Sequence, residues 1–367
     1  MNDSMNENTL SIGPDSTAAC ALRVQAALRT SHPQWAERTP EPLPDKGLAH
    51  WHVRLPGSGL LARVPKQSQM NLPAAANLQY QAACFARAAP SGHVPRLHCV
   101  LPPSANLPRG ALLVEEIMGQ PARLPHDLPA LVQALAAIHA LPLPPDADRA
   151  PLQNPADPMA ALLHEIEQQA QHLDAAKLPA ASRVGIDAVW AQLKKSCAQR
   201  TQPWSRRLIT FDAHPGNFLL RADGRAVLVD LEKARYGVAA LDLAHATLVT
   251  STTWGLESSF ALNPAQVLDA YHWWQQALGL KHTGPPHDWL LARSAMWLWS
   301  VTWCAKWRAC AGAASSSSSD GEDWSTEHSE QHLALHVRGR VDAYLSAIGV
   351  GSVRAELAAL AQAWGLE

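Results

Sequence analysis

The sequence predicts an α+β protein with two lobes, a small β-rich N-terminal lobe and a larger helical C-terminal lobe. Strand-like segments cluster before residue 117, whereas apolar residues recur at helical spacing after Gly119. A short β-hairpin interrupts the helical part between residues 207 and 230. The chain has 367 residues, of which 47% are hydrophobic, so it contains enough apolar side chains for two cores.

Composition excludes several classes of partner. The net charge is −2, and charged residues make up only 17% of the chain, which argues against nucleic acid or an anionic membrane as a partner. The longest uncharged apolar stretch, Ser294–Ala305, is shorter than the ~18–20 residues of a membrane span. No secretory signal is visible, and the scattered cysteines are typical of free thiols. We therefore expect a cytoplasmic protein, and nothing in the sequence indicates its oligomeric state.

The N-terminal lobe is predicted over residues 17–117, after a disordered tail at 1–16. Strands are expected at 51–55 and 60–64, joined by the Pro56–Gly59 turn. A helix is expected at about 74–88. A buried strand follows at 111–117.

Residues 118–367 are predicted to form the helical lobe. Asp127 and Asp157 are candidate N-caps, each followed by apolar residues at helical spacing. The serine-rich and acidic segment 315–330 has loop composition. Later helices are expected at about 264–278, 286–311, 331–347 and 352–364.

Three polar residues in the 207–230 segment are of the types that phosphoryl transfer needs, and two of them have the spacing of kinase catalytic loops. That reaction needs a carboxylate near the attacking hydroxyl, oxygen ligands for Mg²⁺ and a cation on the phosphates. Asp212 and Asn217 lie five residues apart, which is the D-x-x-x-x-N spacing of kinase catalytic loops. Asp230 ends an apolar strand across a tight Asp-Gly turn from Asn217. We expect Asp212 to orient or accept the substrate proton, and Asn217 and Asp230 to bind the metal.

Residues 208–245, LITFDAHPGNFLLRADGRAVLVDLEKARYGVAALDLAH, resemble the aminoglycoside/choline phosphotransferase family. The family pattern is approximately HGD-x-H-x-x-N, then a strand and D-[WFL]-E. The resemblance implies a bilobal protein-kinase-like fold and transfer of phosphate from ATP, or GTP, to a hydroxyl of a small molecule. It implies that Asp212 is the catalytic residue, Asn217 and Asp230 the metal ligands, and Asp242 a structural aspartate.

Weaker similarities extend the resemblance to the N-terminal lobe, which would bind the nucleotide. The segment LLARVPK resembles the strand that carries the phosphate-contacting cation, either Arg63, which fits the strand pattern better, or Lys66. Gly47, before the first strand, is the only candidate to cover the phosphates. The segment LLVEEIMG resembles the hinge, where Glu115 or Glu116 would mark the backbone groups that bind adenine.

The chain also departs from the family pattern. Thr210-Phe211 stands where the family has His-Gly, and Gln81 stands where it usually has a glutamate paired with the phosphate-binding cation. A Gln81 that faces Arg63 would replace an ion pair by a hydrogen bond. These departures leave a non-catalytic nucleotide-binding pseudokinase or scaffold as the alternative.

Other residues have two interpretations. Glu232 either holds the loop or approaches the metal, whereas His214 and His139 are expected to stabilise the loop and the core. Trp299, Trp303 and Trp307 share one helix face, either as bulky core or as an aromatic wall for a cationic substrate.

A late acidic cluster suggests a cationic acceptor, an amino alcohol or an aminoglycoside, although a solvated acidic loop is the simpler interpretation. A negatively charged cleft attracts cationic substrates. The cluster contains no lysine or arginine and consists of Asp320, Glu322, Asp323, Glu327 and Glu330.

Overall fold

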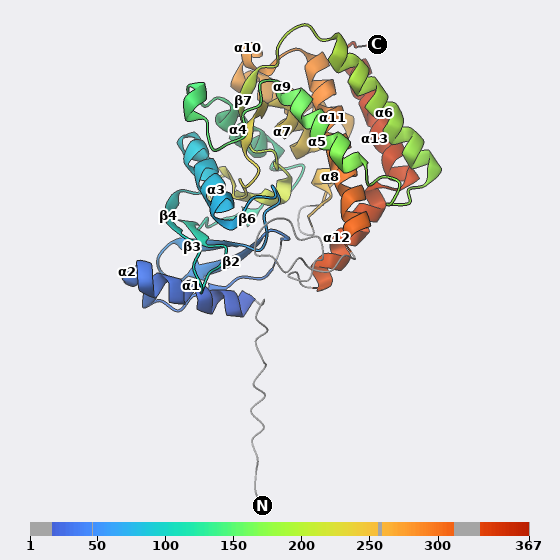
Figure 1. Ribbon diagram of the computed structural model, residues 1–367. Helices are drawn as coiled ribbons and strands as arrows, with labels where there is room; N and C mark the ends of the chain where they lie inside the picture. Colours follow the sequence, from blue (N-terminus) through green and yellow to red (C-terminus); the bar gives the residue numbers. More distant parts are fainter. Residues whose placement is uncertain (1–16, 46, 256–258, 312–330, 367) are drawn as a thin grey trace, which may run out of the picture.

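A computed structural model describes residues 17–45, 47–255, 259–311 and 331–366. The predicted tail at 1–16 and the acidic cluster at 320–330 lie outside the described residues. An antiparallel sheet near the N-terminus lies beside a larger helical part (Figure 1). The α+β class with a small sheet-containing part and a large helical part is therefore confirmed.

The N-terminal part contains a five-stranded sheet of order β1-β2-β3-β5-β4. The predicted hairpin is β2–β3, and both Gly57 and Gly59 of its turn have a φ of +68°, in the left-handed region that glycine tolerates. The strands are β1 (Glu41–Pro42), β2 (His50–Leu55), β3 (Leu60–Pro65), β4 (Leu97–Leu101) and β5 (Ala111–Glu115).

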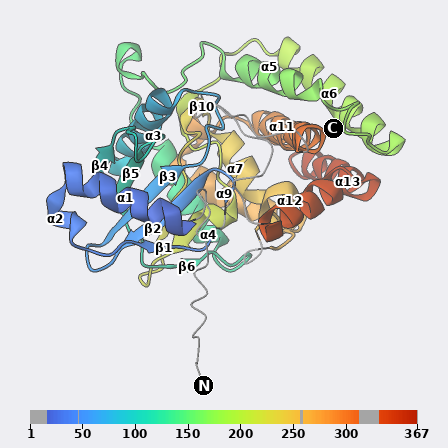
Figure 2. The same cartoon turned by 60° about the horizontal axis from the view of Figure 1, so that its bottom comes forward.

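The two faces of this sheet have different neighbours. Helix α1 (Thr17–Ser31), which the sequence analysis did not predict, packs Val24 and Leu28 against Val53 and Ala62 on one face (Figure 2). Side chains alternate along a strand, so Arg63 points to the opposite face. Helix α3 (Ala74–Ala88), found at its predicted bounds, lies on that side (Figure 1). The alternation therefore directs Arg63 away from α1 and toward the rest of the molecule.

Two small sheets carry the segment around residues 207–238. Strand β7 (Arg206–Ile209) pairs with β10 (Arg235–Val238), and β8 (Phe218–Leu220) pairs with both β6 (Gln120–Pro121) and β9 (Ala226–Leu228). The predicted 218–228 hairpin is thus present. Its last strand ends before Asp230, which leaves that side chain just beyond the sheet.

The remaining helices form the larger part, and several agree closely with expectation. Asp157 caps its helix by accepting hydrogen bonds from the backbone of Met159 and Ala160.

No single described helix is long and apolar enough to cross a membrane; α12 and α13 meet that criterion only when taken together, across a 59° bend. The helices are α2 (Pro33–Ala36), α4 (Leu128–His139), α5 (Pro158–Ala170), α6 (Ala180–Gln199), α7 (Ala240–Thr247), α8 (Val249–Thr252), α9 (Pro264–Leu278), α10 (Leu280–Thr283), α11 (Pro286–Cys310), α12 (Gln331–Tyr344) and α13 (Ala347–Ala363), with single 3₁₀ turns at Ala89–Ser91, Asp146–Asp148 and Pro215–Asn217.

A buried ion pair fixes the segment that precedes β2. Lys66, just after β3, places Nζ 2.7 and 2.6 Å from the two carboxylate oxygens of Asp45 and 2.8 Å from the carbonyl oxygen of Gly47. Both charged side chains are almost fully buried. The pair therefore holds Asp45 and Gly47 against the end of β3.

We predict that Asp45→Ala destabilises the protein by about 3–5 kcal/mol, because it leaves the ammonium group of Lys66 buried without its counter-charge. Urea unfolding measures the loss. Asp187→Ala is the control, since it removes an exposed ion pair with Arg183 that is worth at most about 1 kcal/mol. Equal losses in the two variants would show that the Lys66 pair is not important for stability.

Candidate active site

The buried carboxylate of Asp242, on α7, fixes the loop that begins at Thr210. Its Oδ2 accepts hydrogen bonds from the backbone N–H (2.7 Å) and the hydroxyl (3.0 Å) of Thr210, and its Oδ1 accepts one from Phe211 N–H (2.8 Å). His139 Nε2 lies 3.1 Å from Oδ2, and Trp274 Nε1–H donates to His139 Nδ1. His139 is fully buried, as expected for a core histidine. Asp242 thus has the structural role that the resemblance implied.

The Thr210-Phe211 substitution keeps this loop anchored. Phe211 has a φ of +57°, a conformation that costs a non-glycine residue roughly 1–2 kcal/mol, which explains why glycine suits this position. Its buried ring is covered by Arg235, 3.8 Å from the ring centroid, and by Trp299 at 5.2 Å between centroids. Burial of a phenyl ring, together with the extra Thr210 hydroxyl bond, offsets the strain.

Asp212 follows Phe211 in this loop and is largely buried, beside a lysine that was not predicted from the sequence. Lys233 Nζ is 2.9 Å from Asp212 Oδ2, and His245 Nδ1 is 4.0 Å from Oδ1. Burial alone raises the pKa of Asp212, but Lys233, together with the smaller effects of His214 and His245, outweighs burial and holds the pKa below its ordinary value. The carboxylate is therefore available as a proton acceptor at neutral pH.

The β8–β9 hairpin brings Asn217 and Asp230 together. The N–H of Val229 donates to the carbonyl oxygen of Asn217 at 2.8 Å, so Val229 lies opposite Asn217 and Asp230 is the next residue. Asn217 Nδ2 donates to the carbonyl oxygen of Asp212 at 2.9 Å, which leaves its amide Oδ1 as the acceptor atom. His214 Nδ1 accepts from Gly216 N–H, as expected for a residue that stabilises the loop.

Arg63, and not Lys66, contacts the acidic group of the site. Its guanidinium donates to Asp230 Oδ1 at 2.7 Å and to the carbonyl oxygen of Val229 at 2.6 Å. Burial raises the pKa of Asp230, but Arg63, with smaller contributions from His50 and Lys233, outweighs burial and holds that pKa well below its usual range. Lys66 is instead committed to Asp45. Of the two cations left open by the sequence, Arg63 is the one that the structure brings to the site.

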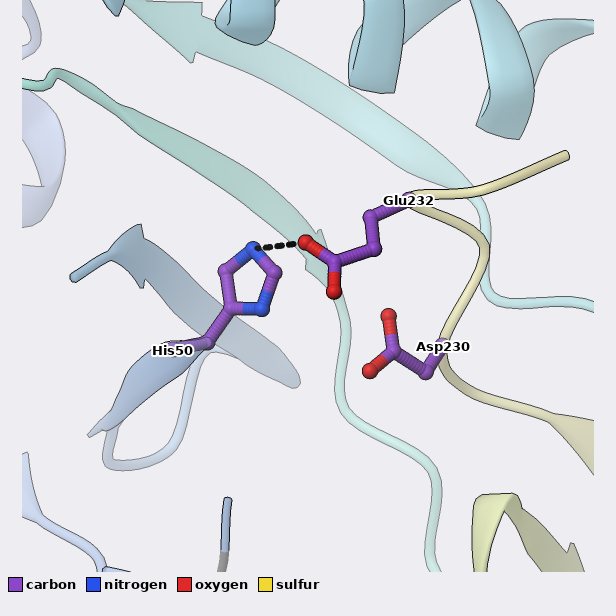
Figure 3. A group of neighbouring side chains, drawn as sticks. All are labelled: His50, Asp230 and Glu232. Atoms are coloured by element: carbon purple, nitrogen blue, oxygen red, sulfur yellow. Dashed lines mark ion pairs between the residues drawn. The ribbon is translucent and has the colours of Figure 1, made fainter. Parts of the chain in front are cut away.

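A histidine on β2 joins the acidic residues (Figure 3). One ligand atom each from His50, Asp230 and Glu232 lies within 4.8 Å of the others, and His50 Nε2 is 3.8 Å from Glu232 Oε2. Burial, and then the negative charge of Asp230, raises the pKa of Glu232 to about 8. This position agrees with the interpretation in which Glu232 approaches a metal ion and does not only hold the loop.

The hydrogen bond of Gln81 corrects our expectation for that residue. We expected Gln81 to face Arg63, but its Oε1 lies 3.0 Å from His50 Nε2, whereas Arg63 lies 3.4 Å from His50 Nδ1. The ring of His50 therefore stands between the two. No residue identity in the helix indicated this arrangement, because His50 comes from a distant strand.

These groups line one cavity of about 830 Å³. Arg63, Asp212, Asn217 and Asp230 are all in its wall, as is Gly47. Glu116 is not in the described lining: its carboxylate binds Arg54 and its N–H donates to the carbonyl oxygen of Gly59 at 2.8 Å. The hinge role of Glu115 or Glu116 remains a prediction.

Lys233, His50 and His245 are among the lining residues that sequence reasoning missed. Lys233 directly follows the D-L-E triplet, so its position was a usable signal. His50 and His245 reach the site through strand pairing and helix packing, which single-sequence patterns do not report.

This fold and site define the class of protein-kinase-like phosphotransferases that act on small molecules. Residues 42–281 match the model of the phosphotransferase enzyme family, and the chain belongs to that family. The resemblance noted in the sequence is thereby confirmed. No curated protein matches the chain.

Solved structures share the fold. A choline/ethanolamine kinase family protein from Mesorhizobium loti is 16% identical, with a TM-score of 0.57 over 92% of this chain and 97% of that one. The GDP complex of aminoglycoside 2'-phosphotransferase-IIIa is 13% identical, with a TM-score of 0.58 over 89% and 98%. Spectinomycin phosphotransferase, in complex with ADP and spectinomycin, is 9% identical, with a TM-score of 0.59 over 92% and 98%.

We predict that Lys233→Met moves the acid limb of the pH–rate profile to higher pH. Removal of the cation lets the pKa of Asp212 rise, so the carboxylate becomes protonated, and inactive as a base, at a higher pH than in the wild type. The kcat/KM for ADP release, measured against pH, reports the shift. Lys194→Met, which removes an exposed lysine over Trp190, is the control. Coincident acid limbs would contradict the role of Lys233.

Proposed function

We propose that this protein transfers the γ-phosphoryl group of ATP to a hydroxyl group of a small molecule, with Mg²⁺ as cofactor. The observation that carries the proposal is the convergence of Asp212, Asn217, Asp230 and Arg63 on one cavity. These supply the carboxylate, the oxygen ligands and the cation that phosphoryl transfer needs. Spectinomycin phosphotransferase, which shares the fold, is seen with ADP and its substrate, which supports a nucleotide and a small-molecule acceptor.

In this mechanism Asp212 accepts the proton of the acceptor hydroxyl. The acceptor oxygen forms a bond to the γ-phosphorus while the bond from that phosphorus to the β,γ-bridging oxygen breaks, and ADP leaves with the electron pair. Lys233 keeps Asp212 ionised, and Arg63 is placed to contact phosphate oxygens. Positioning and charge stabilisation carry most of such a reaction.

The donor set fits Mg²⁺. Asp230 offers a carboxylate and Asn217 an amide oxygen, the hard ligands that this ion prefers, and Glu232 adds a second carboxylate close to Asp230. Burial, and then repulsion from Asp230, raises the pKa of Glu232, so a divalent cation would stabilise both carboxylates in their ionised form. When bound, the ion neutralises charge on the phosphate oxygens.

We assign nucleotide binding to residues 17–117 and the acceptor site to residues 118–367. The position of Arg63 on β3, and of the aromatic lining on α11, supports this division. The cationic acceptor inferred from the acidic cluster stays a prediction, since that cluster lies outside the described residues.

An ADP-release screen at saturating Mg-ATP tests the proposal against amino alcohols, aminoglycosides, sugars and ring-bearing alcohols. Acceptor-dependent ADP release is expected. Nucleotide binding without turnover across the whole panel would favour the alternative, a pseudokinase or scaffold.

We predict that Asp212→Asn lowers kcat by about 10²–10⁴, because the amide cannot accept the hydroxyl proton. The affinity for Mg-ATP should remain near the wild-type value, since the mutation changes no assigned metal ligand. Steady-state kinetics and calorimetry measure the two quantities. A near-normal kcat would place the proton acceptor elsewhere.

We also predict that Asp230→Ala and Asn217→Ala each weaken nucleotide binding in Mg²⁺, because each removes an oxygen ligand from a site with few protein ligands. Calorimetric titration with ATP, in Mg²⁺ and in EDTA, separates metal from nucleotide contacts. The loss should be much smaller in EDTA. Wild-type binding of Mg-ATP by both variants would refute the metal assignment.

A further inference from the structure

The part of the cavity beyond Asp212 is walled by aromatic rings, which we call the aromatic end. It is formed by Trp254, Trp299, Trp303 and Tyr344, contributed by the segment after α8 and by α11 and α12, which lie together in Figure 1. The Trp254 ring centroid is 5.7 Å from that of Trp303 and 6.3 Å from that of Tyr344. Lys233 Nζ lies 5.5 Å from the Trp299 ring and 2.9 Å from Asp212. The aromatic end therefore begins beside the proposed proton acceptor.

The described carboxylates of the cavity are already engaged, which limits the acceptors that it can bind. Asp45 pairs with Lys66, Asp212 with Lys233, and Asp230 with Arg63. The remaining lining carboxylate, Glu232, is buried beside His50 on β2. A molecule with several primary ammonium groups needs a carboxylate partner for each group that it buries. The described aromatic end supplies none.

Instead, this region has buried polar atoms that make no hydrogen bond to any described residue. They are Thr250 Oγ1, Ser251 Oγ, His245 Nδ1 and Trp299 Nε1, and all four residues line the cavity. Thr250, Ser251 and His245 are each less than a tenth exposed, at 6%, 2% and 7%. Buried polar groups normally have hydrogen-bond partners, so these atoms mark a wall built from neutral polar side chains and not from carboxylates.

We propose that the acceptor is an alcohol that carries a flat aromatic or heteroaromatic ring with at most one delocalised positive charge. The ring packs against Trp254 and Trp303, face to face with one and edge to face with the other, and the hydroxyl reaches Asp212. This inference rests on the proposed function and narrows its substrate class.

Binding can be tested independently of turnover. Calorimetry with the non-hydrolysable analogue AMP-PNP and Mg²⁺ compares three probes: 2-(pyridin-3-yl)ethanol, 2-cyclohexylethanol and the tetra-amine aminoglycoside neamine. We expect the pyridyl alcohol to bind about tenfold more tightly than the cyclohexyl alcohol, because only its ring is flat enough to stack. Neamine should bind no better than the cyclohexyl alcohol. Tightest binding of neamine would overturn the inference and would point to the acidic residues at 320–330.

Variants locate the binding site. Trp254→Leu and Trp303→Leu should each weaken pyridyl alcohol binding by about three- to tenfold and leave AMP-PNP binding unchanged. Trp254→Phe retains an aromatic ring, so it should lose less affinity for the pyridyl alcohol than Trp254→Leu. Trp190→Leu, which alters a tryptophan outside the described cavity lining, should bind like the wild type. Wild-type affinity in both leucine variants would overturn the inference.

The ADP-release assay with the same probes separates the two proposals. Tryptophan-dependent binding of the pyridyl alcohol without ADP release by any acceptor would support the ring site and contradict the proposed function. Turnover with neamine but not with the ring alcohols would support the function and contradict the ring site.

Discussion

The buried carboxylate of Asp242 is the contact on which the geometry of the site depends. It accepts hydrogen bonds from two consecutive backbone N–H groups at Thr210 and Phe211, and so it determines where the next residue, Asp212, is placed. The same carboxylate is 3.1 Å from His139 on α4. A single side chain thus joins two helices of the larger part to the loop that carries the proposed proton acceptor. Phe211 is held in a left-handed conformation by these bonds and by its ring contacts.

Charge is distributed around the cavity as separate pairs, each with a different consequence. The Lys66–Asp45 pair is structural, because it fixes the segment before β2. The Arg63–Asp230 pair joins β3 to the end of the hairpin, across the two parts of the molecule. In the Lys233–Asp212 pair, the cation keeps the carboxylate ionised despite burial. With these carboxylates engaged, the aromatic end is left to bind its ligand through rings and neutral polar groups.

Local patterns in the sequence predicted much of this structure. The turn at 56–59, helix α3 and the 218–228 hairpin follow from propensity and periodicity, and the five-residue spacing of Asp212 and Asn217 is itself local. Long-range contacts were not predictable in this way. The pairing of β7 with β10 and the His50–Gln81 hydrogen bond join distant segments. The glutamine at position 81 was noticed, but its partner was misassigned, because no local pattern shows which strand residue lies opposite a given residue of α3.

Phosphoryl transfer to an alcohol can be followed by ³¹P NMR of a complete reaction. Wild-type protein is mixed with Mg-ATP and the best acceptor from the screen. We expect a new phosphate-monoester resonance that grows in step with ADP and is absent without acceptor. Consumption of ATP to give only inorganic phosphate, or no consumption with any acceptor, would contradict phosphoryl transfer to an alcohol.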